Sequence, residues 1–181
     1  MTDTKSPSIA DRIAVVVEDI TRLDVDIIVN AADKKLLGGA GVDQAIHDAA
    51  GSELLESCRA LGGCEAGDAK VTRGFNLPAS HVVHTVGPLW NGGGYDERAL
   101  LESCYRKSLA CGLALEAKTI AFPCISTGIY GYPKSDACRI AVNIVREHLA
   151  AHTSPSHVIF CCFTDADAEL YRRALQAPDA N

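Results

Sequence analysis

The chain has 181 residues, about the length of one ordinary domain, and its 48% hydrophobic and 22% charged residues are typical of a globular fold. The formal net charge is −6 and Lys and Arg form no cluster, so we expect no nucleic acid partner. No apolar run approaches the roughly 18 residues needed to cross a bilayer, so we expect no membrane contact. An anionic ligand would have to be held by backbone N–H groups and helix dipoles, because the bulk charge opposes it.

Patterns of apolar residues predict strands that alternate with helices. β-branched runs indicate strands, and apolar residues at helical spacing indicate helices. The expected strands are Arg12–Glu18, Asp24–Asn30, Ala69–Arg73, His81–Val86, Thr119–Phe122 and Val158–Phe163. The expected helices are Val42–Ala50, Ser52–Leu61 with a Ser52 cap, Asp96–Ala117, one that starts at Pro133, and Ala166–Leu175. This alternation predicts an α/β fold whose sheet is largely parallel and covered on both faces.

We assign residues 11–176 to a single domain and expect a monomer. Residues 1–10, which lack the order of a signal peptide, and residues 177–181 are predicted to be disordered tails. The eight cysteines show no C-x-x-C spacing and mostly lie in apolar patterns, so we expect free thiols and a cytoplasmic location. The histidines form no H-E-x-x-H motif, so no metal site is expected.

A first glycine-bearing loop follows the second predicted strand and runs from Asn30 to Asp43. In α/β folds ligands bind at the carboxyl ends of the strands, where this loop lies. Its glycines allow the backbone to approach a ligand closely, and the helix after it directs free N–H groups and a positive dipole end into the same space. Asp43 has a second interpretation, because acidic residues are favoured in the first turn of any helix.

A second loop, Pro123–Gly131, follows the Thr119–Phe122 strand. Gly128 and Gly131 free its backbone, and its large residues between glycines suggest that they cover something other than core. An ordinary tight turn is the alternative. Neither loop forms a standard nucleotide motif: the first lacks the third glycine of a dinucleotide fingerprint, and at Gly62–Gly67 the lysine of a P-loop is replaced. We expect no cofactor.

Several short sequence motifs, which follow one another along the chain, resemble those of a known protein family. They are Glu18-Asp-Ile-Thr21, Ile28-Val-Asn-Ala-Ala32, Leu37-Gly-Gly-Ala-Gly-Val-Asp43, Ala45-Ile-His-Asp-Ala-Ala-Gly51, His84-Thr-Val-Gly-Pro88 with Trp90, and Ser126-Thr-Gly-Ile-Tyr-Gly131. From about Arg12 to Leu175 the chain resembles the macrodomain family, specifically its MacroD-type branch. The resemblance implies a three-layer α/β/α sandwich with a mixed, largely parallel central sheet.

The resemblance also implies a function and a site. Members of this branch bind ADP-ribose, deacetylate O-acetyl-ADP-ribose and remove mono-ADP-ribose from acidic side chains. The expected partner is therefore ADP-ribose, O-acetyl-ADP-ribose or a mono-ADP-ribosylated protein. By position, Asp43 is similar to the catalytic aspartate of the family. The ligand-binding residues implied in the same way are Asp19 and Ile20 at the adenine with Phe163 against its ring, Asn30, and the two loop segments Gly39, Ala40, Gly41, Val42 and Ser126, Thr127, Gly128, Ile129, Tyr130.

Two positions in the first loop depart from the family pattern. Asp33 stands where the family has the second Asn of Asn-Ala-Ala-Asn, and an ionised Asp can accept but not donate to a ribose hydroxyl. It would also place a second carboxylate near Asp43, so we include Asp33 with Asp43 as candidate catalytic residues. Ala40 replaces a glycine, and its methyl group would be strained if that residue needs a positive φ.

The sequence is compatible with three functions. The first is an ADP-ribosyl ester hydrolase, which Asp43 and both loops favour. The second is a reader that binds ADP-ribose without turnover, which Asp33 favours. The third is a protein that binds or processes another nucleotide or an RNA end, which the acidic charge disfavours.

Overall fold

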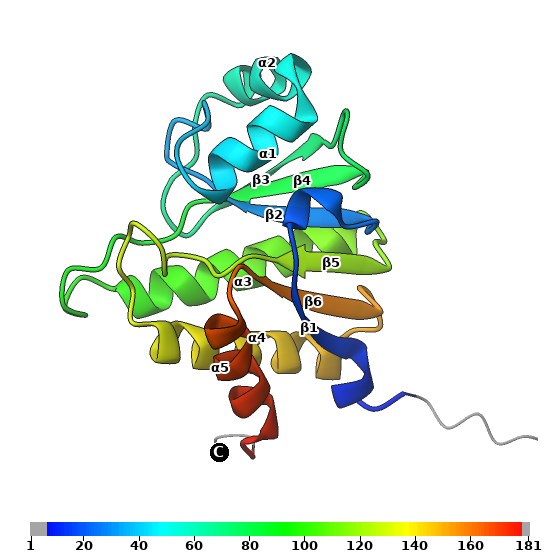
Figure 1. The fold of residues 1–181 in the computed structure, drawn as a ribbon, viewed down its shortest axis with the longest axis vertical. Helices are drawn as coiled ribbons and strands as arrows, with labels where there is room; N and C mark the ends of the chain where they lie inside the picture. The colour runs from blue at the N-terminus through cyan, green and yellow to red at the C-terminus, as the bar shows by residue number, and fades with distance from the viewer. Residues whose placement is uncertain (1–6, 179–181) are drawn as a thin grey trace, which may run out of the picture.

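Six short apolar strands pair into one sheet. The computed structural model describes residues 7–178, and within them the strands are β1 (Ile13–Val17), β2 (Ile27–Ala31), β3 (Ala69–Arg73), β4 (His81–Thr85), β5 (Thr119–Phe122) and β6 (His157–Cys162). Their order is β1-β6-β5-β2-β4-β3, and β3 is the strand that runs antiparallel to its neighbour. The sheet is thus mixed and largely parallel, as expected (Figure 1).

Helices cover both faces of this sheet (Figure 1). One layer holds α1 (Val42–Ala50) and α2 (Ser52–Leu61), and the other holds α3 (Glu97–Ala114), α4 (Lys134–Ala151) and α5 (Asp165–Gln176). Strand β2 explains the two layers, since Ile27 and Val29 are buried in the core with α3 and α4, whereas Ile28 is buried in the core with α1 and α2. The predicted three-layer α/β/α sandwich is confirmed.

Most predicted boundaries hold to within a few residues, and backbone geometry explains how α3 and α2 begin. Helix α3 begins at Glu97 because Asp96 has a left-handed φ of 59°, and it ends at Ala114. The predicted Ser52 cap is wrong. Gly51, with φ 88°, is the N-cap of α2, and no side chain caps that helix end.

The amino-terminal region is anchored through Arg12, the last residue of the short 3₁₀ helix η1 (Ala10–Arg12). Ile9 packs against the core, so ordered contacts extend into the segment expected to be a tail. The Arg12 guanidinium donates hydrogen bonds to four backbone carbonyls around the end of α4, those of Leu149, His152, Pro155 and Ser156. Residues 1–6 and 179–181 of the predicted tails lie outside the described residues.

Three properties of residues 7–178 bear on the chemistry of a site. No helix there is long and apolar enough to span a bilayer. No group of three or more His, Cys, Asp or Glu side chains in this range could hold a metal ion. All eight cysteines fall in this range, and they are free, as the sequence indicated.

Candidate ligand-binding and active site

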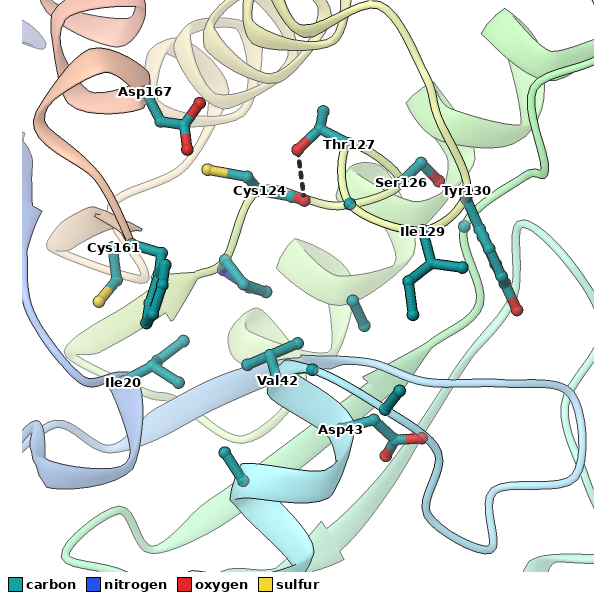
Figure 2. A pocket seen from close by; sticks show the side chains of 18 of the residues that line it. Ile20, Val42, Asp43, Cys124, Ser126, Thr127, Ile129, Tyr130, Cys161 and Asp167 are labelled. Atoms are coloured by element: carbon teal, nitrogen blue, oxygen red, sulfur yellow. Dashed lines mark hydrogen bonds between the residues drawn. The ribbon is translucent and has the colours of Figure 1, made fainter.

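A cleft of about 1020 Å³ opens at the carboxyl ends of the parallel strands. That volume lies at the upper end of the roughly 300–1,000 Å³ common for small-molecule sites. Figure 2 shows Ile20 and Cys161 at one end, and Ile129 and Tyr130 over Asp43 at the other. The predicted site residues that line the cleft are Asp19, Ile20, Asp33, Gly39, Ala40, Gly41, Val42, Asp43, Ser126, Thr127, Gly128, Ile129, Tyr130 and Phe163. The structure therefore brings both loops together.

Asn30 is the predicted ligand-binding residue that does not line the cleft. It is fully buried at the end of β2, and its Nδ2 atom donates to Asp43 Oδ1 at 2.8 Å. The strand carries its side chain behind Asp43, because the alternation along β2 directs Asn30 toward α1. Asn30 therefore supports the Asp43 carboxylate and does not form part of the cleft wall.

The first loop presents backbone donors to the cleft. Gly41, with φ 62°, is the N-cap of α1. The N–H groups of Ala40, Gly41 and Val42 donate to no other group among residues 7–178. Ala40 is not among the residues with positive φ, so its methyl group costs no backbone strain and the expected clash does not arise. These donors and the positive end of α1 can hold an anion without a cationic side chain.

Gly39 lies beside two carboxylates. A Cβ atom at this residue would lie 3.1 Å from Asp43 Oδ2 and 3.7 Å from Asp33 Oδ2. Asp33 and Asp43 therefore meet at the same point of the cleft, as the sequence predicted. Asp33 also shapes the loop, since its Oδ1 atom accepts from the backbone N–H groups of Lys35 and Leu36 at 3.0 and 2.9 Å.

Asp43 is a buried carboxylate with one unused oxygen. Its residue is 2% exposed, and burial raises the pKa of the Asp43 carboxyl. The hydrogen bond from Asn30, the charge of His47 and the backbone N–H of Asp33 oppose that rise, and the charge of Asp33 adds to it. Asp43 Oδ2 has no hydrogen-bond partner among residues 7–178. Such an oxygen can accept a proton or a hydrogen bond from a bound water.

The second loop is strained and tightly packed. Ser126 has a positive φ of 64° and is 7% exposed, a conformation that costs on the order of 1–3 kcal/mol in a non-glycine residue. Gly87 lies so close that a Cβ atom there would be 2.1 Å from Ser126 Oγ. Strain of this kind at a cleft favours a functional role over an ordinary turn.

The backbone of the second loop faces the cleft with free donors. The N–H groups of Gly128, Ile129 and Tyr130 form no hydrogen bond with another described residue. The Thr127 hydroxyl donates to Cys124 O at 3.0 Å and so serves the loop itself (Figure 2). The cleft is thus bordered by backbone N–H groups from both loops.

The opposite end of the cleft combines an acceptor with an apolar ring. Asp19 caps η2 (Ile20–Arg22), and the hydroxyl and backbone N–H of Thr21 donate to Asp19 Oδ1 at 2.7 and 3.0 Å. These hydrogen bonds lower the pKa of Asp19, so its carboxylate stays an acceptor. Phe163 follows β6 and is 90% exposed, an unusual state for a large apolar residue.

Carboxylates dominate the charged lining of the cleft. Among the described lining residues, Lys134 is the one basic side chain, and its Nζ atom lies 2.7 Å from Asp167 Oδ1. The acidic lining residues are Glu18, Asp19, Asp33, Asp43 and Asp167. An anionic ligand would therefore depend on backbone donors, as the net charge suggested.

Sequence reasoning missed several contributors. His47 Nε2 lies 3.6 Å from Asp43 Oδ1, and the i, i+4 spacing of the two residues on α1 was a usable signal. Gly87 and Lys134 line the cleft from segments that had been assigned no role. Their contribution depends on contacts between distant segments, which spacing along the chain does not reveal.

The layers and the cleft are those of α/β proteins that bind a ligand at the carboxyl ends of parallel strands. The Macro domain family matches residues 29–141. An O-acetyl-ADP-ribose deacetylase of Citrobacter koseri is 53% identical, over 87% of this chain and 91% of its own. The ADP-ribose glycohydrolase MACROD2 of Xenopus laevis is 48% identical, over 93% of this chain and 41% of its own. The Trypanosoma brucei macrodomain solved in complex with ADP-ribose superposes with a TM-score of 0.86 at 39% identity, over 91% of this chain and 69% of that one. The chain belongs to the macro domain family, in its MacroD-type branch.

Proposed function

We propose that the protein hydrolyses ADP-ribosyl esters, with Asp43 as the residue that positions the attacking water. The observation that carries this proposal is the free Asp43 Oδ2 atom, buried at the end of the cleft beside Gly39. The naming of a 53% identical relative as an O-acetyl-ADP-ribose deacetylase supports the substrate class.

In this proposal, the donors and acceptors that line the cleft determine how the ligand is oriented. The adenine amino group donates to Asp19, and the ring packs against Phe163 beside Ile20. The diphosphate accepts from N–H groups of the two loops, and the positive end of α1 favours it. The proximal ribose then lies at the Asp43 end, under Ile129 and Tyr130 (Figure 2).

The proposed reaction is an ester hydrolysis. A water that donates a hydrogen bond to Asp43 Oδ2 attacks the acyl carbon, and Asp43 accepts its proton as the new carbon–oxygen bond forms. The bond between the acyl carbon and the ribose oxygen breaks, the ribose oxygen takes the proton from Asp43, and a carboxylic acid and ADP-ribose leave. The raised pKa of Asp43 makes its carboxylate a stronger base than an exposed aspartate.

Incubation of the protein with O-acetyl-ADP-ribose tests the proposal, with ADP-ribose formation followed by chromatography. We expect turnover that added ADP-ribose inhibits competitively, because product and substrate share the cleft. A protein mono-ADP-ribosylated on glutamate is the second substrate. Calorimetric binding of ADP-ribose without turnover of either substrate would contradict the hydrolase and support the reader, which the extra carboxylate of Asp33 favours.

A further inference from the structure

We propose that His84 is a positioning residue that fixes the Asp43 carboxylate by holding the side-chain amide of Asn30 in one orientation. The inference rests on the proposed function, since it concerns the carboxylate to which that function assigns the reaction. His84 itself does not line the cleft.

Strand pairing sets the geometry of this arrangement. Asn30 on β2 and His84 on β4 are register partners at the carboxyl ends of two parallel strands, and both are fully buried. Asn30 Nδ2 lies 2.8 Å from Asp43 Oδ1 and 3.2 Å from His84 Nδ1. An amide nitrogen has two N–H bonds, so one atom can serve both partners.

The donor and acceptor roles follow from this chemistry. An ionised carboxylate only accepts, so it is the amide nitrogen of Asn30 that faces Asp43. That nitrogen only donates, so His84 Nδ1 must accept. The neutral ring then carries its proton on Nε2, which donates to Thr72 Oγ1 at 2.9 Å. The hydrogen bonds thus run outward from Asn30, one to Asp43 and the other to His84, which in turn donates to Thr72 on β3.

His84 remains an acceptor because it stays neutral. Burial, with the charge of His47 in addition, lowers the pKa of His84 to about 3. A protonated ring would present N–H at Nδ1 and could not accept from Asn30. The His84 ring therefore stays neutral, and can accept from Asn30, at pH values well above 3.

The amide of Asn30 has no other means of orientation. Its Oδ1 atom has no hydrogen-bond partner among residues 7–178, so the two Nδ2 contacts decide which way it points. The ionisable groups that face Asp43 are Asp33 from its loop, His47 on α1 at 3.6 Å, and Cys58 on α2. Asn30 donates the one side-chain hydrogen bond that Asp43 accepts among residues 7–178, so loss of the His84 acceptor would leave Asp43 less firmly held.

The test compares His84→Leu, which removes the acceptor, with His84→Asn, whose Oδ1 atom can accept near the position of Nδ1. His81→Leu on the same strand is the matched control. In ligand-free protein, ¹³C NMR titration of the Asp43 carboxyl should show a higher pKa in His84→Leu than in His84→Asn or wild type. With O-acetyl-ADP-ribose, kcat should fall about tenfold in His84→Leu with KM unchanged, because the substrate contacts remain.

An unchanged Asp43 titration in His84→Leu would overturn the inference. That titration needs no substrate, so it distinguishes a failure of this inference from a failure of the proposed hydrolysis. Because His84→Leu could fail to fold, ¹⁵N NMR of the wild-type protein supplies an independent measurement. It should show His84 protonated at Nε2, and a proton at Nδ1 would contradict this arrangement.

Discussion

Gly87→Ala should weaken ADP-ribose binding about a hundredfold. Overpacking costs roughly 1–3 kcal/mol when a rigid segment must move, and a hundredfold loss of affinity falls within that range. The new Cβ atom would lie 2.1 Å from Ser126 Oγ and 2.8 Å from Ile125 Cγ2, and Ile125 is buried. The second loop must shift to relieve these contacts. Its N–H groups, those of Gly128, Ile129 and Tyr130, then no longer lie where we propose that they bind the ligand. Calorimetry with ADP-ribose measures the loss.

Two variants control this prediction. Gly94→Ala introduces a methyl group where no atom lies within 4 Å and φ is not positive, so binding should be unchanged. Ser126→Gly suits the positive φ of that residue and removes the hydroxyl, so adding it to Gly87→Ala should restore part of the affinity. Equal affinity of Gly87→Ala and wild type would show that the second loop does not bind the ligand.

Asp33→Asn should raise kcat/KM on O-acetyl-ADP-ribose about tenfold, because it removes a charge next to the ligand and supplies an amide donor. The loop should survive, since an Asn Oδ1 atom can accept from the N–H groups of Lys35 and Leu36 as Asp33 does. Burial raises the pKa of Asp43 and the charge of Asp33 raises it further. The variant lowers that pKa, so the acid limb of the pH–rate profile should move to lower pH.

The control for Asp33→Asn is Asp48→Asn, which makes the same change in net charge at an exposed position of α1 outside the cleft. It should leave kcat/KM and the acid limb unchanged. If Asp33→Asn lowers both affinity and rate, the Asp33 carboxylate contributes to binding and turnover. The prediction that it weakens them is then wrong.

The sequence predicted the fold where local patterns are strong. The unbroken apolar run of Ile27, Ile28 and Val29 indicated a strand covered on both faces, and these residues are buried in opposite core layers. The glycines before Val42 indicated a helix start open to a ligand, and Gly41 caps α1 there. These features depend on neighbours in the chain, so a sequence pattern is enough to identify them.

Features made by distant segments were not predictable in the same way. The positive φ of Ser126 and the contact that requires Gly87 depend on the packing of two loops against each other. Asn30 was expected at the ligand from the resemblance to the macrodomain family, but strand alternation buries it behind Asp43. Its pairing with His84 depends on the register of β2 against β4, which neither strand specifies alone.

Backbone donors explain how the acidic cleft would bind the anionic ligand that we propose. The described lining residues include one basic side chain, Lys134, and it is paired with Asp167. Free N–H groups in both loops take the place of cations. Affinity on this account depends on loop geometry more than on net charge.

The cleft is proposed to bind ADP-ribose while Asp43 drives the reaction, and Asp43→Asn separates these two roles. The substituted amide keeps the shape of the side chain and an acceptor for Asn30, but it cannot take a proton from water. ADP-ribose affinity by calorimetry should stay within about threefold of wild type, while turnover of O-acetyl-ADP-ribose should fall about a thousandfold. Turnover near the wild-type rate at matched affinity would contradict the account.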